Sequence, residues 1–545
     1  MAKGQGTKRS QLPAALPGAT SFSDDRAELD PLAVVRLLKQ QRRLCDRLVR
    51  VTTIRASGVG RQRGRGSWAL AYIAFVASRK YADIEPWWSV AAANPQLWRE
   101  CGFPDGRPPY PTVYERFTEL EQFAWEFQTT VGELVQQARR ASGGLVGRDV
   151  HVDSCEEETH ARLVHDCQPG EQCRREAELL KRRRQRTRSG RQAPVSPPLY
   201  PDRDTCKHAG EERGKLATEP PLEAEPKFAG LADRVSTVSR GQREVQRLRI
   251  NGCWYRSLDT EAGIRCYGGK QKRSFKFWHG YYNTKAIDHF TAAPLSILIS
   301  SASKAECHIY PVLLDRVLST VGGNIRSMVA DKGFSVESVY QENTSRGIFS
   351  VMPFRRGSHR TRPEYATDEY DAHGVPKCKH CRSEGVFVSF TLKPKPRLFF
   401  RCSINCPASG GKRQSISCET KWRFLLPLWR TTELYHALRA SHGSYERVHG
   451  FFRRRYHVGG DSCDTRAKRL GLGARQLRAN AALVIEWLLI NWRQGWSGGR
   501  PRNEKPIWVQ RGARELAGLL RYRARLAAQQ LQLAAANTAH GPAPP

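Results

Sequence analysis

The 545-residue chain has no long apolar run and comparatively few acidic residues. Its longest apolar runs, such as residues 68–77, are too short to cross a bilayer, and its first residues contain no apolar core of the signal-peptide type. We therefore expect a cytoplasmic protein that does not enter a membrane. A chain of this length can bury several cores, so we also expect two to four domains.

Basic residues dominate the charge of the chain. Lys and Arg number 89 against 53 Asp and Glu, which gives a net charge of +36 spread along the sequence. Such a field attracts polyanions by steering and by releasing counterions from phosphates, so nucleic acid is the expected partner. The 15 Cys of a cytoplasmic chain should be mostly reduced, and regularly spaced ones are better interpreted as metal ligands than as disulfides.

The first part of the chain has helical patterns. Residues 1–29 are polar and expected to be disordered, whereas residues 30–142 predict a helical module. Asp30 and Pro31 form an N-cap and first-turn pair that opens an amphipathic, basic helix over residues 31–50. Further helices are expected over residues 67–81 and 112–140. The module is either an ordinary packing domain or one that binds DNA ends or dimerises.

A mixed sheet is predicted next. Alternation around Val150 and Val152 predicts a strand that ends at Asp153. Residues 166–245 are basic and Pro-rich, which indicates a flexible insertion that is solvated or holds phosphates. The following patterns predict, in order, strands over residues 273–286 and 294–303, a helix over 305–321, a buried strand over 325–331, a helix over 335–344 and a strand over 348–354.

Two aspartates occupy the ends of predicted core strands. Asp331 ends the buried run IRSMVAD, and a buried carboxylate there is a cap, an ion-pair partner or a metal ligand. Asp153 ends the first strand, which should lie beside the strand of Asp331. Carboxylates from separate elements hold Mg²⁺ or Mn²⁺, and two such ions can activate a nucleophile and stabilise a leaving oxygen in phosphodiester chemistry. A third acid is then required on a nearby helix.

Residues 357–420 form a Cys-rich segment that differs in composition from its surroundings. Two residues separate Cys378 from Cys381, and three separate Cys402 from Cys406, so four thiolates could surround one tetrahedral Zn²⁺. Cys418 offers an alternative ligand. The other interpretation is a set of unligated thiols in a loop-rich insertion.

The C-terminal part is predicted to be helical. Residues 421–500 carry helical patterns, and residues 501–545 suggest a helix and a tail. One amphipathic helix over residues 475–496 has an apolar stripe that we expect to pack in the core: Leu477, Ala481, Val484, Leu488 and Trp492.

Three acidic motifs resemble those of a known family. DSCEEETHARL around Asp153, VADKGF around Asp331 and YERVHGFFRRRY around Glu446 are similar to the motifs of DDE transposases from bacterial insertion sequences of the IS4-like superfamily. The segment PPYPTVYERFTEL is similar to the one that precedes their first catalytic strand. The resemblance covers roughly residues 30–500, without the basic insertion and the Cys-rich segment.

The resemblance implies an α/β, RNase H-like catalytic domain, formed by residues 143–165 and 246–356 and completed by residues 421–500. Asp153, Asp331 and Glu446 would bind two Mg²⁺ or Mn²⁺ ions, with Glu433 as the competing third acid. Arg453 replaces the Lys that follows the Glu of the IS4-like pattern after six residues. It would share a helix face with Glu446 and contact DNA phosphate, and Lys332 could do the same.

The expected activity is that of a transposase. It would bind the ends of its mobile element in double-stranded DNA, hydrolyse a phosphodiester at each end and direct the freed 3′-hydroxyl at target DNA. We expect a nucleoid-associated protein that forms a homodimer in the synaptic complex, with a zinc-stabilised Cys-rich module. The alternatives are a non-catalytic, zinc-containing nucleic-acid-binding protein derived from a transposase, and a metal-dependent nuclease that cuts arbitrary DNA without joining ends.

Overall fold

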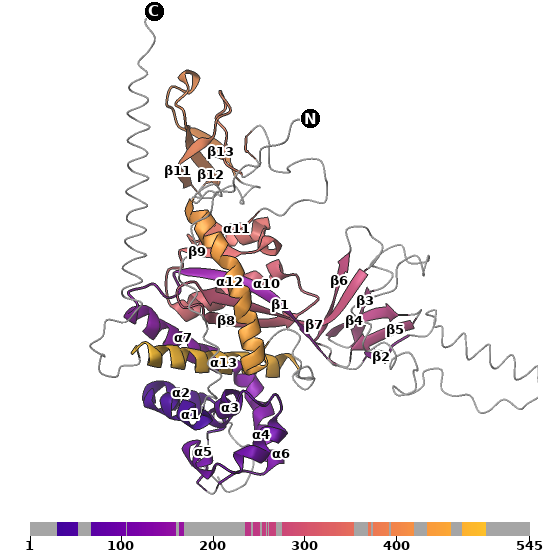
Figure 1. The fold of residues 1–545 in the computed structure, drawn as a ribbon. Coiled ribbons are helices and arrows are strands. Elements are labelled where there is room, and N and C mark those ends of the chain that lie inside the picture. Colours follow the sequence, from indigo (N-terminus) through magenta and orange to yellow (C-terminus); the bar gives the residue numbers. More distant parts are fainter. Residues whose placement is uncertain are drawn as a thin grey trace, which may run out of the picture.

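The fold is that of a computed structural model of the chain (Figure 1). The described residues are 30–52, 67–104, 106–159, 163–167, 235–240, 243–250, 253–257, 259, 261–268, 275–353, 369–371, 374–391, 394–418, 433–458 and 471–496. The expected disordered start, most of the basic insertion and the C-terminal helix and tail lie outside these residues.

The N-terminal module is helical, as predicted. It consists of α1 (Pro31–Gln40), α2 (Arg42–Val51), α3 (Trp68–Ala77), α4 (Ile84–Ala91), α5 (Pro95–Glu100), α6 (Tyr110–Glu119), the 3₁₀ helix η1 (Leu120–Phe123) and α7 (Ala124–Ala141). The single helix expected over residues 31–50 is wrong, because the backbone leaves the helical region at Gln41 (ψ 59°). The break lets α1 and α2 each turn a short apolar face inward. The helix expected over residues 112–140 is likewise divided by η1.

The central sheet has six strands and mixed directions. It contains β1 (Asp149–Glu158), β6 (Gly263–Gly268), β7 (Phe275–Asp288), β8 (Pro294–Ser301), β9 (Ser327–Ala330) and β10 (Phe349–Val351). The strand order is β10-β9-β1-β7-β6, with β8 also paired to β7. The pairs β10·β9 and β9·β1 are parallel, whereas β7 runs antiparallel to β1, β6 and β8. The strands predicted from the alternating and apolar runs are therefore present.

Two smaller sheets project from the central body (Figure 1). One, in the order β2-β5-β4-β3, consists of β2 (Leu163–His165), β3 (Val235–Arg240), β4 (Arg243–Ile250) and β5 (Cys253–Ser257). The other belongs to the Cys-rich segment and consists of β11 (Gly385–Thr391), β12 (Arg397–Cys402) and β13 (Gln414–Ser417). Residues 235–240 and 243–245, which the sequence placed in the flexible insertion, thus contribute strands to the first of these sheets.

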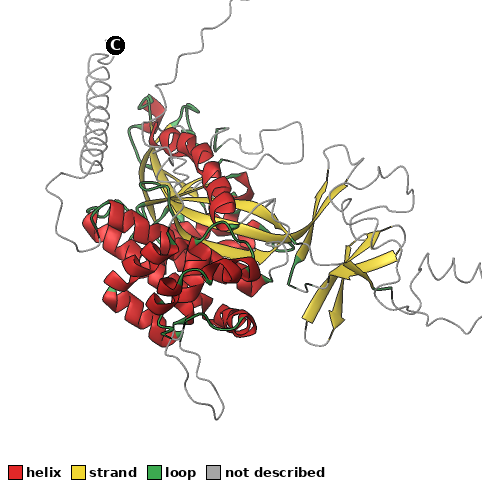
Figure 2. Ribbon diagram, turned by 60° about the horizontal axis from the view of Figure 1, so that its bottom comes forward, coloured by secondary structure: helices red, strands yellow, loops and turns green. Residues whose placement is uncertain are grey.

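Helices cover both faces of the central sheet (Figure 2). The remaining helices of the described residues are α10 (Glu306–Val321), the 3₁₀ helix η4 (Lys332–Phe334), α11 (Glu337–Ser345), the short 3₁₀ helix η5 (Pro407–Ser409), α12 (Glu433–Tyr456) and α13 (Leu472–Arg493). Val150 and Val152 of β1 join the large apolar core with α7, α10 and α13. His151 and Asp153, which alternate with them, face α12. The alternation of β1 therefore separates the main core from the polar face beneath α12.

The α13 helix joins the N-terminal helices to the sheet. Between Leu477 and Leu489 its residues are buried almost without exception, so it has no polar face of the kind expected from the sequence. Trp492, predicted to belong to the core, has a relative exposure of 56%. Side-chain amides fix the helix on both sides: Asn480 Nδ2 donates to the carbonyl of Ala124, and Gln476 Nε2 donates to that of Ile297.

A buried carboxylate fastens the start of β1 to the start of β9. Asp149 accepts hydrogen bonds from Arg326 Nε (2.7 Å) and Nη2 (2.6 Å) and from the Ser327 hydroxyl (2.7 Å). Burial raises the pKa of Asp149, but its hydrogen bonds and ion pair with Arg326 outweigh that effect and lower the pKa overall. The pair sets the register of the two strands on which Asp153 and Asp331 depend.

We expect Asp149→Ala to lower the free energy of unfolding by about 3 kcal/mol, since it leaves a partly buried Arg326 without its carboxylate. Asp315→Ala, which removes a carboxylate from an exposed pair with Arg346, should cost less than about 1 kcal/mol. Urea denaturation measures both. Because the folded-state pKa of Asp149 is lowered, its contribution is complete above about pH 4 and disappears as the pH falls through that lowered value. Equal costs for the two variants would contradict this role.

Candidate active site and metal centre

Asp153 and Asp331 lie side by side on neighbouring parallel strands. The pairing of β1 with β9 runs from Asp149 and Ser327 to Val152 and Ala330, and each aspartate is the next residue of its strand. The expectation that the two strands are neighbours is confirmed. The expectation that Asp153 ends its strand is wrong, because β1 continues to Glu158 through its pairing with β7. Asp153 instead marks the point at which β1 parts from β9.

Each aspartate is held by a local hydrogen bond. Asp153 Oδ1 accepts from the N–H of Ser154 (2.9 Å), and Asp331 Oδ1 accepts from the N–H of Gly333 (2.7 Å). The second bond caps η4, which confirms that Asp331 is a cap. A carboxylate has two oxygens with several acceptor positions, so a cap can also be a metal ligand.

Basic side chains surround Asp153. His449 Nε2 on α12 lies 3.3 Å from Asp153 Oδ2, and the buried Lys285 on β7 contacts His449 Nδ1 at 2.9 Å. Because the Lys285 ammonium can only donate, His449 Nδ1 accepts, which leaves the ring proton on Nε2 toward Asp153. Burial raises the pKa of Asp153, but His449 and His442 lower it by more than burial raises it. The net shift of the pKa is therefore downward. Asp153 is therefore kept ionised.

The α12 helix lies against β1 and β9 on the Asp153 side of the sheet. His442 Nδ1 lies 3.3 Å from His151 Nδ1, and the Tyr445 hydroxyl lies 3.0 Å from His289 Nδ1. Arg439 donates to the carbonyl of Ala330, the residue before Asp331. The face of α12 that carries residues 439, 442, 445 and 449 thus packs toward Asp153 and toward Ala330, the residue before Asp331.

Glu446 belongs to this part of α12. Its position follows His442 by four residues and precedes His449 by three, which places it on the same helix face, within about 60° of both. The structure describes the backbone of Glu446 but not its side chain. The competing acid, Glu433, is exposed and begins α12, about 24 Å along the helix from His449. The position of Glu433 does not suit a site that includes Asp153.

The two expected phosphate contacts occupy different surroundings. Lys332 is exposed in η4, directly after Asp331. Arg453 is partly buried in the last turns of α12, seven residues beyond Glu446. Both assignments stay predictions.

Sequence reasoning missed three residues of this region: Lys285, His449 and Glu306. Lys285 stands opposite Asp153 in the β1·β7 register, and a Lys in the middle of a predicted central strand was a signal for it. His449 follows Glu446 by three residues, a spacing that places both on one helix face. Glu306 at the start of α10 gave no signal, because acids are common in the first turn of a helix.

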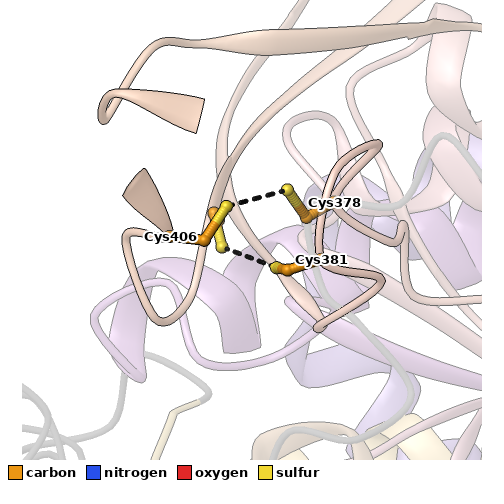
Figure 3. Close-up of side chains that lie close together, drawn as sticks. Cys378, Cys381 and Cys406 are labelled. Atoms are coloured by element: carbon orange, nitrogen blue, oxygen red, sulfur yellow. Dashed lines mark hydrogen bonds between the residues drawn. The ribbon is translucent and has the colours of Figure 1, made fainter. Parts of the chain in front are cut away.

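The four predicted zinc ligands converge. The sulfur atoms of Cys378, Cys381, Cys402 and Cys406 all lie within 4.8 Å of one another. The sulfur of Cys378 lies 3.8 Å from that of Cys406 (Figure 3), and the sulfur of Cys381 lies 3.5 Å from that of Cys402. A tetrahedron with Zn–S bonds of about 2.3 Å separates its sulfur atoms by about 3.8 Å, so the arrangement fits zinc.

The surroundings of Cys378 favour its thiolate. Burial raises its pKa, but the backbone N–H of Cys381 and the side-chain amide of Gln414, whose Nε2 lies 3.1 Å from the sulfur, lower it to about 6. The alternative ligand, Cys418, is not a member of the cluster; it packs against Leu398 and lies 3.8 Å from the Tyr370 hydroxyl. The four-Cys group could therefore hold a metal ion without Cys418.

The comparison with protein families indicates the class of protein. Residues 236–479 match the family model described as "Transposase DDE domain". This match supports a DDE transposase and confirms the resemblance at the level of that family. The matched part, a little under half of the chain, includes Asp331, Glu446 and the Cys-rich segment.

No curated protein and no solved structure matches the chain. Among the described residues, no helix is both long and apolar enough to cross a membrane.

Proposed function

We propose that this chain is the transposase of a bacterial insertion sequence of the IS4-like superfamily. It binds the ends of its element, cuts a phosphodiester at each end and joins the freed ends to target DNA. The observation that carries the proposal is the adjacency of Asp153 and Asp331 on paired parallel strands, beneath the helix that contains Glu446. The match to the DDE domain and the net charge of +36 support the same activity and a DNA partner.

Asp153, Asp331 and Glu446 are the proposed ligands of two Mg²⁺ or Mn²⁺ ions. The donor set fits, because hard divalent ions prefer carboxylate oxygens and both aspartates lie at one point of the sheet. The ions would supply activation of the attacking oxygen and neutralisation of the leaving oxygen. His449 and His442 keep Asp153 ionised, and Lys285 contacts the other ring nitrogen of His449.

The remaining chemistry consists of positioning DNA. In the first step the oxygen of water bonds to the phosphorus at the element end, the bond from phosphorus to the 3′-oxygen breaks, and a 3′-hydroxyl is released. In the second step that hydroxyl attacks a target phosphodiester and displaces a target 3′-oxygen. Lys332 and Arg453 would hold the phosphates in line. No covalent intermediate with the protein is needed.

We further infer an RNase H-like fold for the central sheet. The strand order β10-β9-β1-β7 with β8 beside β7, and the mixture of parallel and antiparallel pairs, support it. The N-terminal helices would bind element ends or a second subunit in the synaptic complex. The four-Cys module, closed by zinc, would grip DNA or shape the synapse. A nucleoid-associated location follows from this set of partners.

The test uses purified protein and a DNA fragment that carries both ends of the element, with a fragment of scrambled ends as control. We expect nicks at the element ends and end-to-target joints with Mg²⁺ or Mn²⁺, and neither product with EDTA. Cutting of both fragments alike, without joining, would favour a nuclease. Binding of the ends without any nick would favour a non-catalytic DNA-binding protein.

A further inference from the structure

Glu306 brings a third described carboxylate to the candidate active site. It begins α10, on the face of the sheet opposite α12, and its side chain is only partly exposed. Gly333 lies beside both its carboxylate and that of Asp331. A Cβ placed on Gly333 would lie 2.7 Å from Glu306 Oε2 and 2.9 Å from Asp331 Oδ1. Both carboxylates therefore border the same backbone position.

Glu306 also contacts the strand that carries Asp153. The hydroxyl of Ser154, the next residue of β1, hydrogen-bonds to it. Ser154 in turn shares a 2.9 Å hydrogen bond with Thr284 of β7, which fixes the hydroxyl at this place. Glu306 is thus held between the two strands whose aspartates lie side by side.

The charges around Glu306 are unfavourable without a cation. Burial and the negative charge of Asp331 raise the pKa of Glu306, and Asp153 adds to the effect, while Arg265 of β6 lowers it. The carboxylates of Glu306 and Asp331 repel one another, and a divalent ion between these two would convert the repulsion into attraction. An acid that served only to complement the helix dipole would not need to lie against Asp331.

We propose that Glu306 is a further metal-binding carboxylate of the active site, and that it shares a divalent cation with Asp331. This inference rests on the proposed function, because it takes Asp331 as a metal ligand. It extends the carboxylate set by a residue that lies outside the three acidic motifs. The competing role for Glu306 is structural, as a partner of Arg265.

The test measures Mn²⁺ binding by the full-length, zinc-loaded protein without DNA, from the electron paramagnetic resonance signal of free Mn²⁺. We expect Glu306→Gln to weaken the binding of one ion by about 10-fold or more. Glu126→Gln, which changes a partly buried acid in the first turn of α7, is the matched control and should bind Mn²⁺ like the wild type. Unchanged Mn²⁺ binding by Glu306→Gln would overturn the proposal.

A double variant separates shared ligation from an indirect effect. If Glu306 and Asp331 hold the same ion, Glu306→Gln combined with Asp331→Asn should lose little more affinity than the worse single variant. Fully additive losses would indicate separate causes and overturn the proposal. If Asp331→Asn binds Mn²⁺ as tightly as the wild type does, the metal assignment of the proposed function is overturned as well.

Metal-directed cleavage supplies a readout of where the ion binds, and it does not depend on activity. Fe²⁺ in place of Mn²⁺, with ascorbate and peroxide, generates hydroxyl radicals that cut the backbone near the bound ion. We expect cuts around residues 306 and 331 in the wild type and the loss of both in Asp331→Asn. Cuts at residue 331 without cuts at residue 306 would overturn the inference while leaving the proposed function intact.

Discussion

Asp331→Asn should abolish cutting at the element ends, with a loss of at least about 10³-fold in rate, equivalent to about 4 kcal/mol of transition-state stabilisation. Asparagine has the shape of aspartate, and its Oδ1 can still accept the hydrogen bond from Gly333 N–H that caps η4. The fold and the binding of element ends should therefore persist, whereas the negative charge needed by a hard cation is lost. The rate of nicking in Mg²⁺, with end binding measured in parallel, gives both quantities.

Asp315→Asn provides the control for the change of charge. Asp315 lies in the same part of the chain, on α10, but it is exposed and pairs with Arg346 on the surface. Its replacement should leave nicking within about twofold of the wild type. A variant at position 331 that still nicks at the wild-type rate would remove Asp331 from the active site, and with it the proposed mechanism.

Cys378→Ser should release the metal from the Cys-rich module and unfold the sheet of β11, β12 and β13. The apolar clusters of this module are small, such as that of Tyr370, Phe400 and Ile416, and a segment of this size depends on a metal or a disulfide for stability. Structural zinc supplies about 10–16 kcal/mol of apparent binding energy in comparable peptides, which exceeds what such clusters contribute. We expect the zinc content to fall from about one equivalent to less than half.

Cys418→Ser is the matched control for the zinc prediction. Its sulfur is buried near the Tyr370 hydroxyl and the carbonyl of Ile416, which a serine hydroxyl could also use. We expect this variant to keep its zinc and its protection from proteolysis over residues 377–418. Metal analysis that shows equal loss from both variants, or no zinc in the wild type, would contradict the four-Cys assignment.

The parts of the site that could be predicted are those in which sequence and geometry are tightly linked. An apolar run that ends in aspartate, as in IRSMVAD, directly indicates a strand with a carboxylate at its end. The pairs Cys378 and Cys381, and Cys402 and Cys406, have spacings that few other sites require. The neighbouring positions of Asp153 and Asp331 followed from the order of the strands.

The parts that could not be predicted depend on tertiary contacts. No Pro or Gly marks the break at Gln41, after which α2 packs against α7, whereas α1 packs against α5 and α13. The strand β1 continues past Asp153 because β7 is long enough to pair with it, and the sequence of β1 alone does not contain that information. Glu306 reaches the site only because the chain returns from β8 through α10 beside Asp331.

The position of α13 determines when the molecule can fold during synthesis. Residues 472–493 lie between the first helices and the sheet, and Arg478 donates to the carbonyls of Tyr81 and Ala82, which were made almost 400 residues earlier. At translation rates of about 5–20 residues per second, the N-terminal helices wait on the order of tens of seconds for this partner. A ribosome that stops before α13 would release a chain whose first helices expose the apolar surface that α13 covers. Such a product would be a substrate for chaperones and proteases.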